Sequence, residues 1–438
     1  MYLTDRSTPA AADTEPDRRR GLGPKIAPVV LVLGTVSLIT DISSEMVTAV
    51  LPLYLVTKVG FSPLGFGTLD GVYNGVSALV QLTGGHLADR VRNHKLMAGL
   101  GYGLSALCKP LLLLAGSLGT LGTVLALDRT GKGLRTAPRD AMISLSTPPE
   151  NQGRSFGVHR AMDTTGAMLG PLAAFLILRA AADGYDAVFG VSACVAALGV
   201  LVLVLFVPGR RQDAQTDEAG TPEDRQPARV TDEAGTPEST QPVRVREALA
   251  LLRLPRLRAL AGCAALLGLT TVSDAFVYLL LQRRVGIGEE WFPLLPLGTA
   301  AVFLLLAVPV GALADRVGRH TVFLAGHAGL LTGYALLLWA PATPALPCLV
   351  LALHGTFYAA TDGVLPAALA GIVPEQLRAS GLAIVGTSQA LARFCCSLGF
   401  GAAWTAWGDG PALAGAAVGL LCCATVAGMV LRPTGGTR

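Results

Sequence analysis

The heptapeptide GHLADRV at residues 85–91 recurs with a single substitution as GALADRV at residues 311–317. A second stretch, PENQGRSFG at 149–157, resembles PEQLRASG at 374–381. The members of both pairs are separated by nearly the same distance along the chain. Two polar repeats at one common offset predict that the chain is built from two related halves.

Composition places these halves in a membrane. Of the 438 residues, 52% are hydrophobic and 15% are charged, whereas a typical soluble domain is about 25% charged. The apolar residues form blocks close to the roughly 20 residues that a membrane-spanning helix needs. Because lipid cannot satisfy exposed backbone groups and no alternating barrel pattern occurs, we expect helices. The sequence thus predicts an all-α membrane protein with twelve transmembrane helices, at 27–57, 64–86, 96–116, 119–142, 155–181, 187–208, 257–282, 290–313, 320–340, 345–368, 380–406 and 410–431.

A polar segment divides these blocks into six and six. It contains the tandem copies TDEAGTPEDRQPARV (216–230) and TDEAGTPESTQPVRV (231–245). A segment that tolerates duplication and lacks aromatic residues is typical of a disordered linker. The expected organisation is a cytoplasmic N-terminal tail at 1–25, a six-helix bundle at 26–208, a disordered cytoplasmic linker at 209–250, a second six-helix bundle at 251–432 and a cytoplasmic C-terminal tail at 433–438.

Basic residues set the expected orientation. Arg and Lys are concentrated in the N-terminal tail and in alternate loops, which favours the cytoplasmic side for those segments and for both termini. Arg283 and Arg284 are the exception. Indole rings favour the membrane interface, and the tryptophans fall at the expected outer ends of spans, at Trp291, Trp339, Trp404 and Trp407. We expect a multi-pass protein of a bacterial cell (inner) membrane.

The motifs that are missing exclude other function classes. No catalytic triad, metal cluster or nucleotide motif is present, so neither an enzyme nor a cofactor is expected. The segment TGKGLRT (130–136) does not match a phosphate-binding loop, because Gly133 stands after Lys132 where that loop requires serine or threonine. No basic face interleaved with aromatic residues points to nucleic acid. The expected partners of the chain, which we take as monomeric, are a small-molecule substrate, protons and membrane lipid.

A loop motif in each half resembles that of the major facilitator superfamily, G-x-L-a-D-r-x-G-r-k. In the second half it consists of Gly311, Leu313, Asp315, Arg316, Gly318 and Arg319. In the first half it consists of Gly85, Leu87, Asp89 and Arg90, with Arg92 in place of the second glycine. The resemblance implies that these residues lie on cytoplasmic loops and act on the conformational balance between the halves.

The fourth and fifth spans carry two further motifs of the same family. The pattern R-x-x-q-G is matched by Arg129 and Gly133, with Lys132 replacing the usual glutamine. The pattern G-x-x-x-G-P, associated with antiporters, is matched by Gly166, Gly170 and Pro171. The resemblance covers the chain apart from its termini and linker, and it is to the 12-span drug:proton antiporter type. It implies the major facilitator fold, two six-helix repeats around a central cavity.

The fourth span concentrates charge in LALDRTGKGLRTAPRDAM (125–142). Charged side chains inside a span rarely face lipid, where they are unfavourable. We therefore expect this charged face to line the substrate cavity. At helical spacing the face is a single stripe of Asp128, Lys132, Arg135 and Arg139, with Arg129 and Asp140 to one side. The alternative is that the last three charges, Arg135, Arg139 and Asp140, lie among cytoplasmic headgroups.

Acidic residues in other spans are the candidate proton carriers. Asp41 and Glu45 lie one helical turn apart in the first span, near mid-membrane. They could instead be structural partners of Arg129 or Lys132. That alternative is compatible with proton coupling, because a carboxylate released from a cation can take up a proton. The other candidates for the proton path or the cavity are Arg129, Asp163, Asp274, Asp362 and Arg393.

Three further polar residues of the spans have simpler interpretations. His159 and His354 are possible proton carriers, although a lone histidine in a span is more often packed or hydrogen-bonded. Lys109 is expected to extend its ammonium group outward to the membrane surface.

Taken together, the residues predict a proton-coupled secondary transporter that exports a small organic molecule or drug by alternating access. One alternative is uptake or exchange of an anionic metabolite, which the basic fourth span favours. Another is a membrane sensor or lipid flippase without coupled transport. The fifth-span motif instead favours a cationic or neutral substrate that competes with protons.

The linker assignment predicts that deleting one of the two 15-residue copies, 231–245, leaves folding and transport unchanged, because the segment has no apolar face to bury. The yield of monodisperse protein and the rate of transport into liposomes measure this. A variant that no longer folds would contradict the assignment.

Overall fold

The computed structural model describes residues 27–90, 93–148, 151–181, 184–207, 253–362, 364–370, 373 and 378–431. The predicted tails and linker lie outside these ranges. The described residues are helical throughout apart from short connections, which confirms the predicted all-α class. Seven helical segments are long and apolar enough to cross a membrane by length and composition. The highly charged fourth span is not among them.

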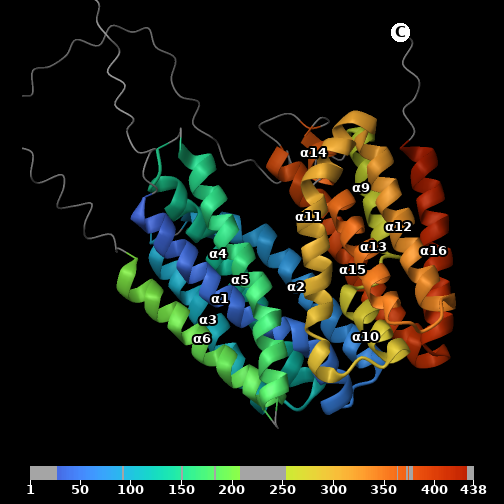
Figure 1. The fold of residues 1–438 in the computed structure, drawn as a ribbon. Helices are drawn as coiled ribbons and strands as arrows, with labels where there is room; N and C mark the ends of the chain where they lie inside the picture. The colour runs from blue at the N-terminus through green and yellow to red at the C-terminus, as the bar shows by residue number, and fades with distance from the viewer. Residues whose placement is uncertain are drawn as a thin grey trace, which may run out of the picture.

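Two groups of helices stand side by side (Figure 1). The first group comprises α1 (Pro28–Leu53) with its π-helical extension η1 (Tyr54–Lys58), α2 (Pro63–Arg90), α3 (His94–Leu114), α4 (Leu118–Leu145), α5 (Gln152–Ala180) and α6 (Gly184–Phe206). The second comprises α9 (Pro255–Gly268), α10 (Asp274–Val285), the 3-10 turn η4 (Glu289–Trp291), α11 (Leu294–Val317), α12 (Arg319–Trp339), α13 (Ala345–Thr361), α14 (Val364–Ala370), α15 (Arg378–Trp407) and α16 (Asp409–Val430). We call these groups the N-terminal and C-terminal bundles.

The seventh predicted span, 257–282, is not one helix. It is interrupted after α9, and residues 271–273 are not helical before α10 begins. The hydroxyls of Thr270 and Thr271 turn back to the carbonyl oxygen of Leu267. The freed backbone N–H of Val272 donates to the Tyr334 hydroxyl at 2.8 Å. A tertiary hydrogen bond thus satisfies the broken backbone, as a non-helical segment inside a membrane requires. The tenth predicted span, 345–368, is likewise divided into α13 and α14.

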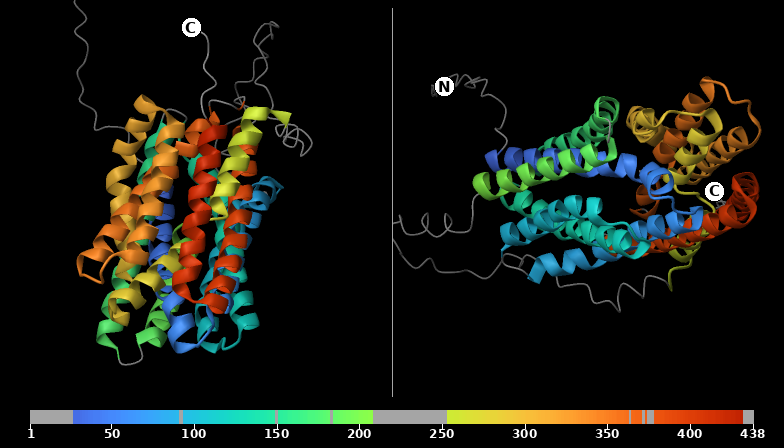
Figure 2. Two further views of the ribbon diagram at one scale, coloured as in Figure 1. Left: turned by 90° about the vertical axis from the view of Figure 1, so that its right-hand side faces the viewer. Right: turned by 90° about the horizontal axis from the view of Figure 1, so that it is seen from below.

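The bundles contact each other mainly through α2 and α15, which lie along one another in Figure 2. Near the start of α2, the N–H of Leu64 donates to the Thr405 hydroxyl at 3.0 Å. On the other side of the interface, the Tyr185 hydroxyl donates to Glu289 at 2.8 Å. Both contacts lie at the end of the molecule that contains the connection from η1 to α2 and the connection from α10 to η4. We call this region the closed end.

The loop motif of the second half occupies a helix end rather than a loop. Asp315 and Arg316 lie in the last turn of α11, and Gly318 follows with φ 108°, a conformation that favours glycine. Arg319 then pairs with Asp315 at 3.1 Å. In the first half, Gly85, Asp89 and Arg90 fall in the last turns of α2, but their side chains and Arg92 lie outside the described set.

Of the four tryptophans predicted at the membrane interface, three are exposed and one is not. Trp404 is 6% exposed because it packs against Phe276 and Phe400 in the closed end. The interface prediction is therefore wrong for Trp404. The exposed indoles are those of Trp291, Trp339 and Trp407.

The fifth-span glycines bring α5 against α1. A Cβ atom at Gly166 would lie 2.5 Å from the carbonyl oxygen of Leu38, and one at Gly170 would lie 2.7 Å from the Cβ of Glu45. No side chain fits at either distance, so the two helices contact each other backbone to backbone. The close contact expected of two small residues four apart is present. Pro171 follows within α5.

This contact predicts that Gly170→Ala destabilises the protein by about 1–3 kcal/mol, because α1 must shift to admit the methyl group. Gly157→Ala is the matched control in the same helix, since a Cβ there meets nothing within 4 Å. Thermal unfolding of the purified protein compares them. Equal melting temperatures for the two variants would contradict the close packing.

Candidate transport cavity

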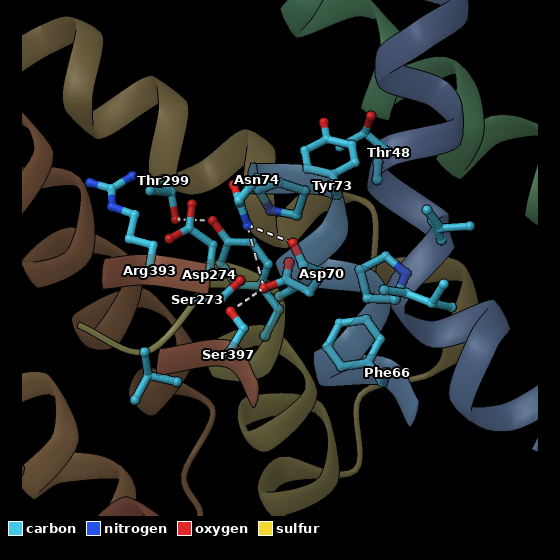
Figure 3. Close-up of a pocket in the computed structure, with 18 of the residues that line it drawn as sticks. Thr48, Phe66, Asp70, Tyr73, Asn74, Ser273, Asp274, Thr299, Arg393 and Ser397 are labelled. Carbon is cyan, nitrogen blue, oxygen red and sulfur yellow. Dashed lines mark hydrogen bonds between the residues drawn. The ribbon is translucent and has the colours of Figure 1, made fainter. Parts of the chain in front are cut away.

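A cavity of about 430 Å³ lies between the bundles, next to the closed end. Six aromatic side chains form much of its wall, from both bundles: Phe66, Tyr73, Tyr278, Phe292, Phe303 and Tyr358. Figure 3 shows polar side chains converging on it from α1, α2, α10 and α15. An apolar cavity with a few convergent polar groups at the junction of two bundles is a typical place for a small ligand.

Five charged side chains line this cavity. Glu45 comes from the N-terminal bundle, and Asp274, Asp362 and Arg393 come from the C-terminal bundle; Asp362 and Arg393 are the two that were named as cavity candidates. Asp70 of α2 is the fifth, and it was not predicted. Four carboxylates therefore face the cavity with one guanidinium group. At neutral pH the lining is anionic if the carboxylates are ionised.

Asp274 lies where helix α10 begins after the break in the seventh span, and two side chains hydrogen-bond to it. It is the first residue of α10, where the helix dipole favours a negative charge. The Tyr358 hydroxyl donates to its carboxylate at 2.6 Å, and His354 Nε2 lies 2.9 Å from the same oxygen. His354 is buried, while Asp274 is 40% exposed to the cavity. The histidine is thus a hydrogen-bonded partner of the carboxylate.

Asp70 contacts the opposite bundle directly. Its carboxylate accepts a hydrogen bond from Ser397 of α15 at 2.6 Å, and Asn74 lies one turn further along α2 (Figure 3). The sequence did contain a signal for it. Asp70 is a charge inside the second apolar block, 64–86, and a charge within a span rarely faces lipid. The same rule that drew attention to the fourth span applies here.

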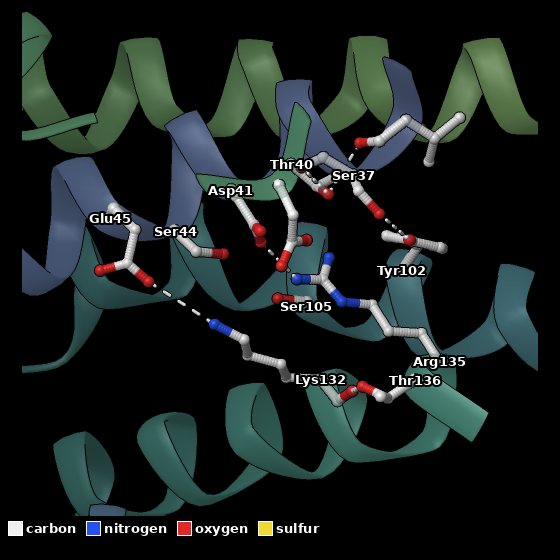
Figure 4. A network of polar contacts seen from close by, with 12 residues as sticks. Ser37, Thr40, Asp41, Ser44, Glu45, Tyr102, Ser105, Lys132, Arg135 and Thr136 are labelled. Carbon is white, nitrogen blue, oxygen red and sulfur yellow. Dashed lines mark hydrogen bonds and ion pairs between the residues drawn. The ribbon is translucent and has the colours of Figure 1, made fainter. Parts of the chain in front are cut away.

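The charged stripe of α4 is not part of the wall of this cavity, although Lys132 is 37% exposed. It faces α1 and α3 inside the N-terminal bundle (Figure 4). Arg135 pairs with Asp41 at 3.1 Å, and its guanidinium group lies over the Tyr102 ring at 4.5 Å. Lys132 pairs with Glu45 at 3.5 Å. The alternative of structural pairing for the first-span acids is therefore the one observed, although Asp41 pairs with Arg135 rather than with Arg129 or Lys132.

Asp128 holds two cations at once. Its carboxylate lies 2.9 Å from Lys109 of α3 and 2.7 Å from Arg129, and it accepts a further hydrogen bond from Ser105 at 2.5 Å. Arg129 also donates to the Tyr73 hydroxyl at 2.8 Å. Lys109 is 2% exposed, so the prediction that it extends outward is wrong. The neighbouring helix supplies an anion, and pairing there replaces solvation at the membrane surface.

Further along α4, Arg139 joins α1 and α5. It donates to Ser37 at 3.2 Å and lies 3.6 Å from Asp163 and 3.0 Å from Asp140. Asp163 also pairs with exposed Arg160 of its own helix, at 3.4 Å. His159 is buried nearby, and neither ring nitrogen has a hydrogen-bond partner in the described structure. Of the predicted cavity residues, the structure therefore moves four away from the cavity wall: Asp128, Arg129, Lys132 and Arg135.

Comparison with known proteins identifies the family. The profile of the Major Facilitator Superfamily matches residues 33–395. The chain belongs to the major facilitator superfamily.

A relative and several solved structures are similar to the chain. An uncharacterised MFS-type transporter of Methanocaldococcus jannaschii is 29% identical over 386 residues, which cover 86% of this chain and 88% of the relative. The nucleoside transporter NupG has a TM-score of 0.75 at 12% identity, covering 93% of this chain and 100% of NupG. A bacterial homologue of the human lysosomal transporter Spinster, inward-facing and occupied, has a TM-score of 0.71 at 14% identity, covering 94% and 98%.

As a member of the superfamily, the chain is a multi-pass membrane protein and a secondary transporter, not an enzyme. The major facilitator fold predicted from the loop motifs is confirmed over more than nine-tenths of the chain. The matches identify the superfamily and not a drug:proton antiporter subtype. In the described ranges, no group of three or more His, Cys, Asp or Glu side chains is placed to hold a metal ion.

The buried pairing in this transporter predicts that Asp128→Asn destabilises it by about 3–5 kcal/mol, because Lys109 keeps its charge without a counter-ion. Asp140→Asn is the control, since Asp140 is 42% exposed and its pair with Arg139 should contribute under about 1 kcal/mol. Thermal unfolding measures both. Lys109→Met should restore part of the stability of Asp128→Asn, and the absence of any rescue would argue against the pairing.

Proposed function

We propose that the chain is a proton-coupled antiporter that exports a small cationic or neutral organic molecule by alternating access. The observation that carries this is the charge of the cavity wall, where Glu45, Asp70, Asp274 and Asp362 face a single guanidinium group, that of Arg393. An organic cation and a proton compete for the same carboxylates, because a protonated carboxyl no longer attracts a cation. Competition of this kind is what antiport requires.

The anionic-metabolite alternative loses its support in the N-terminal bundle. It relied on cations of α4 facing the cavity, whereas Arg135 is committed to Asp41 and Lys132 to Glu45. Arg129 is likewise held by Asp128 and Tyr73. A stripe whose charges are already paired attracts an anion weakly.

Glu45 is the carboxylate best placed to carry the proton. It lines the cavity, it is 26% exposed, and its pair with Lys132 is the longest of the α1–α4 contacts, at 3.5 Å. Asp41 is 9% exposed and lies closer to its partner Arg135. The antiporter-type motif lies against Glu45, because the Cβ of Glu45 packs on Gly170 where any side chain at position 170 would collide with it. The remaining candidates are Asp41, Asp163 and Asp274, with Arg129 as a cation that could modulate them.

The proposal also includes the orientation of the chain in the membrane and the role of the loop motifs. Both termini and the loops that follow α2 and α11 lie on the cytoplasmic side, where the basic residues are concentrated. The motif residues of those loops act on the balance between inward-open and outward-open states. They are Gly85, Asp89, Arg90, Gly311, Asp315, Arg316, Gly318 and Arg319. The chain functions as a monomer in the cell membrane.

The proposal predicts that a pH gradient drives a cationic dye, ethidium, across liposomes that contain the purified protein, and that Glu45→Gln abolishes this flux while ethidium still binds. Asp409→Asn is the control, because this exposed carboxylate lies outside the cavity. Dye fluorescence follows flux, and equilibrium dialysis follows binding.

Two results would count against it. If ethidium binds but no gradient moves it, the chain behaves as a sensor rather than as a coupled transporter. If Glu45→Gln retains full gradient-driven flux, the proton is carried elsewhere, and Asp274→Asn is the next variant to test.

A further inference from the structure

Asp70 and Ser397 belong both to the cavity wall and to the contact that closes it. Asp70 lines the cavity, and its carboxylate accepts a hydrogen bond from Ser397 of the opposite bundle at 2.6 Å (Figure 3). The other hydrogen bonds described at the closed end, from Leu64 to Thr405 and from Tyr185 to Glu289, join residues that do not both line the cavity. A ligand in the cavity can therefore reach the α2–α15 interface through Asp70.

The interface beneath Asp70 is packed backbone to backbone. Gly67, one turn earlier on α2, faces the carbonyl oxygen of Ser397 so closely that no side chain would fit. Gly401, one turn later on α15, faces Pro63 in the same way, since a Cβ atom there would lie 2.6 Å from the proline carbonyl oxygen. Contacts this tight have little tolerance for a shift of either helix. A small displacement at Asp70 is thus transmitted to the whole closed end.

An aromatic cluster seals the same place from the side of α10. Phe276 packs edge-on against Phe66 of α2, at 4.8 Å between ring centroids, and against Phe400 of α15, at 4.9 Å. All three rings are buried. Asp70 lies at the cavity-side edge of this seal, where α2, α10 and α15 meet.

The hydrogen-bond partners of Asp70 are neutral. They are the hydroxyls of Ser397 and Ser273 and the Asn74 amide, and no ion pair of Asp70 is found among the described residues. Asp274, from the other bundle, lines the same cavity as Asp70. A hydrogen bond between two charged groups is stronger than one between a carboxylate and a hydroxyl. An ammonium group in the cavity would therefore attract the Asp70 carboxylate more strongly than the Ser397 hydroxyl does.

We propose that Asp70 is the positioning residue through which an occupied cavity loosens the closed end. The cationic group of an organic amine draws the carboxylate away from Ser397, and the α2–α15 interface loses the hydrogen bond at its cavity edge. A proton does not have this effect, because a carboxylic acid still shares a hydrogen bond with the hydroxyl. Cation loading then favours opening at this end. The inference rests on the proposed function in one respect, the cationic class of the substrate.

Hydrogen exchange of the full-length protein in detergent tests this, read in peptides from residues 63–77 of α2 and 391–407 of α15. The probes are phenethylamine and phenethyl alcohol, which share a skeleton and differ in charge. In the wild type, the amine should speed exchange in both peptides and the alcohol should not. Ser397→Ala should speed it about tenfold without any probe, the scale expected for losing a hydrogen bond to a charged group.

Asp70→Asn separates the two roles, since the amide still accepts from Ser397 but does not attract a cation. Its basal exchange should lie between those of the wild type and Ser397→Ala, because a neutral acceptor makes the weaker bond, and its response to the amine should be lost. Asp362→Asn is the control, because it removes the same charge from the same cavity at a residue of the C-terminal bundle with no described bond to α2. That variant should keep the response.

Other outcomes overturn the inference. It fails if Asp70→Asn still responds to the amine, if Asp362→Asn loses the response equally, or if Ser397→Ala exchanges like the wild type. The proposed function is judged separately. An amine response without pH-driven flux would refute proton coupling and leave the role of Asp70 intact, whereas flux without an amine response would do the reverse.

Discussion

A cation buried in a membrane protein needs an anion beside it, and the N-terminal bundle is organised around that requirement. The Asp128 carboxylate binds Lys109 and Arg129 together, and about two turns further along α4 Arg135 binds Asp41. These pairs join α1, α3 and α4 where lipid could not solvate the charges. Because the bundle pairs these cations within itself, none of them pairs with Asp70, Asp274 or Asp362 in the described structure, and Glu45 alone among the cavity carboxylates has a cation of this bundle beside it, Lys132.

The C-terminal bundle uses a different device. Its seventh span is broken, and the Tyr334 hydroxyl satisfies the backbone at the break, so the new helix α10 begins inside the protein with Asp274 as its first residue. Tyr358 and His354 then orient that carboxylate toward the cavity. A discontinuous helix that presents its end to a central site is a recurring construction in secondary transporters.

The cavity is therefore lined by two bundles that hold their carboxylates in different ways. One contributes Glu45, held loosely by Lys132, and the other contributes Asp274, held by neutral groups and a histidine. Asp70 stands between them and bonds across the interface. The carboxylate of Asp70 is thus both a charge of the cavity wall and an acceptor in the contact between the bundles. A ligand that binds this carboxylate differently in the closed and the open state would shift the balance between the two states.

The sequence by itself determined the membrane, the helices and the two halves, because these follow from apolar block length and from repeated local motifs such as that at Gly311 and Asp315. It also placed most of the charges on helices. Only the tertiary structure decided which acid meets which cation. The angle of Arg135 along α4 could be calculated, but whether the cavity or Asp41 lies opposite depends on how the helices are rotated and packed. For Asp70, too, the sequence could not name the partner, because Ser397 is remote in the chain and is brought to it only by folding.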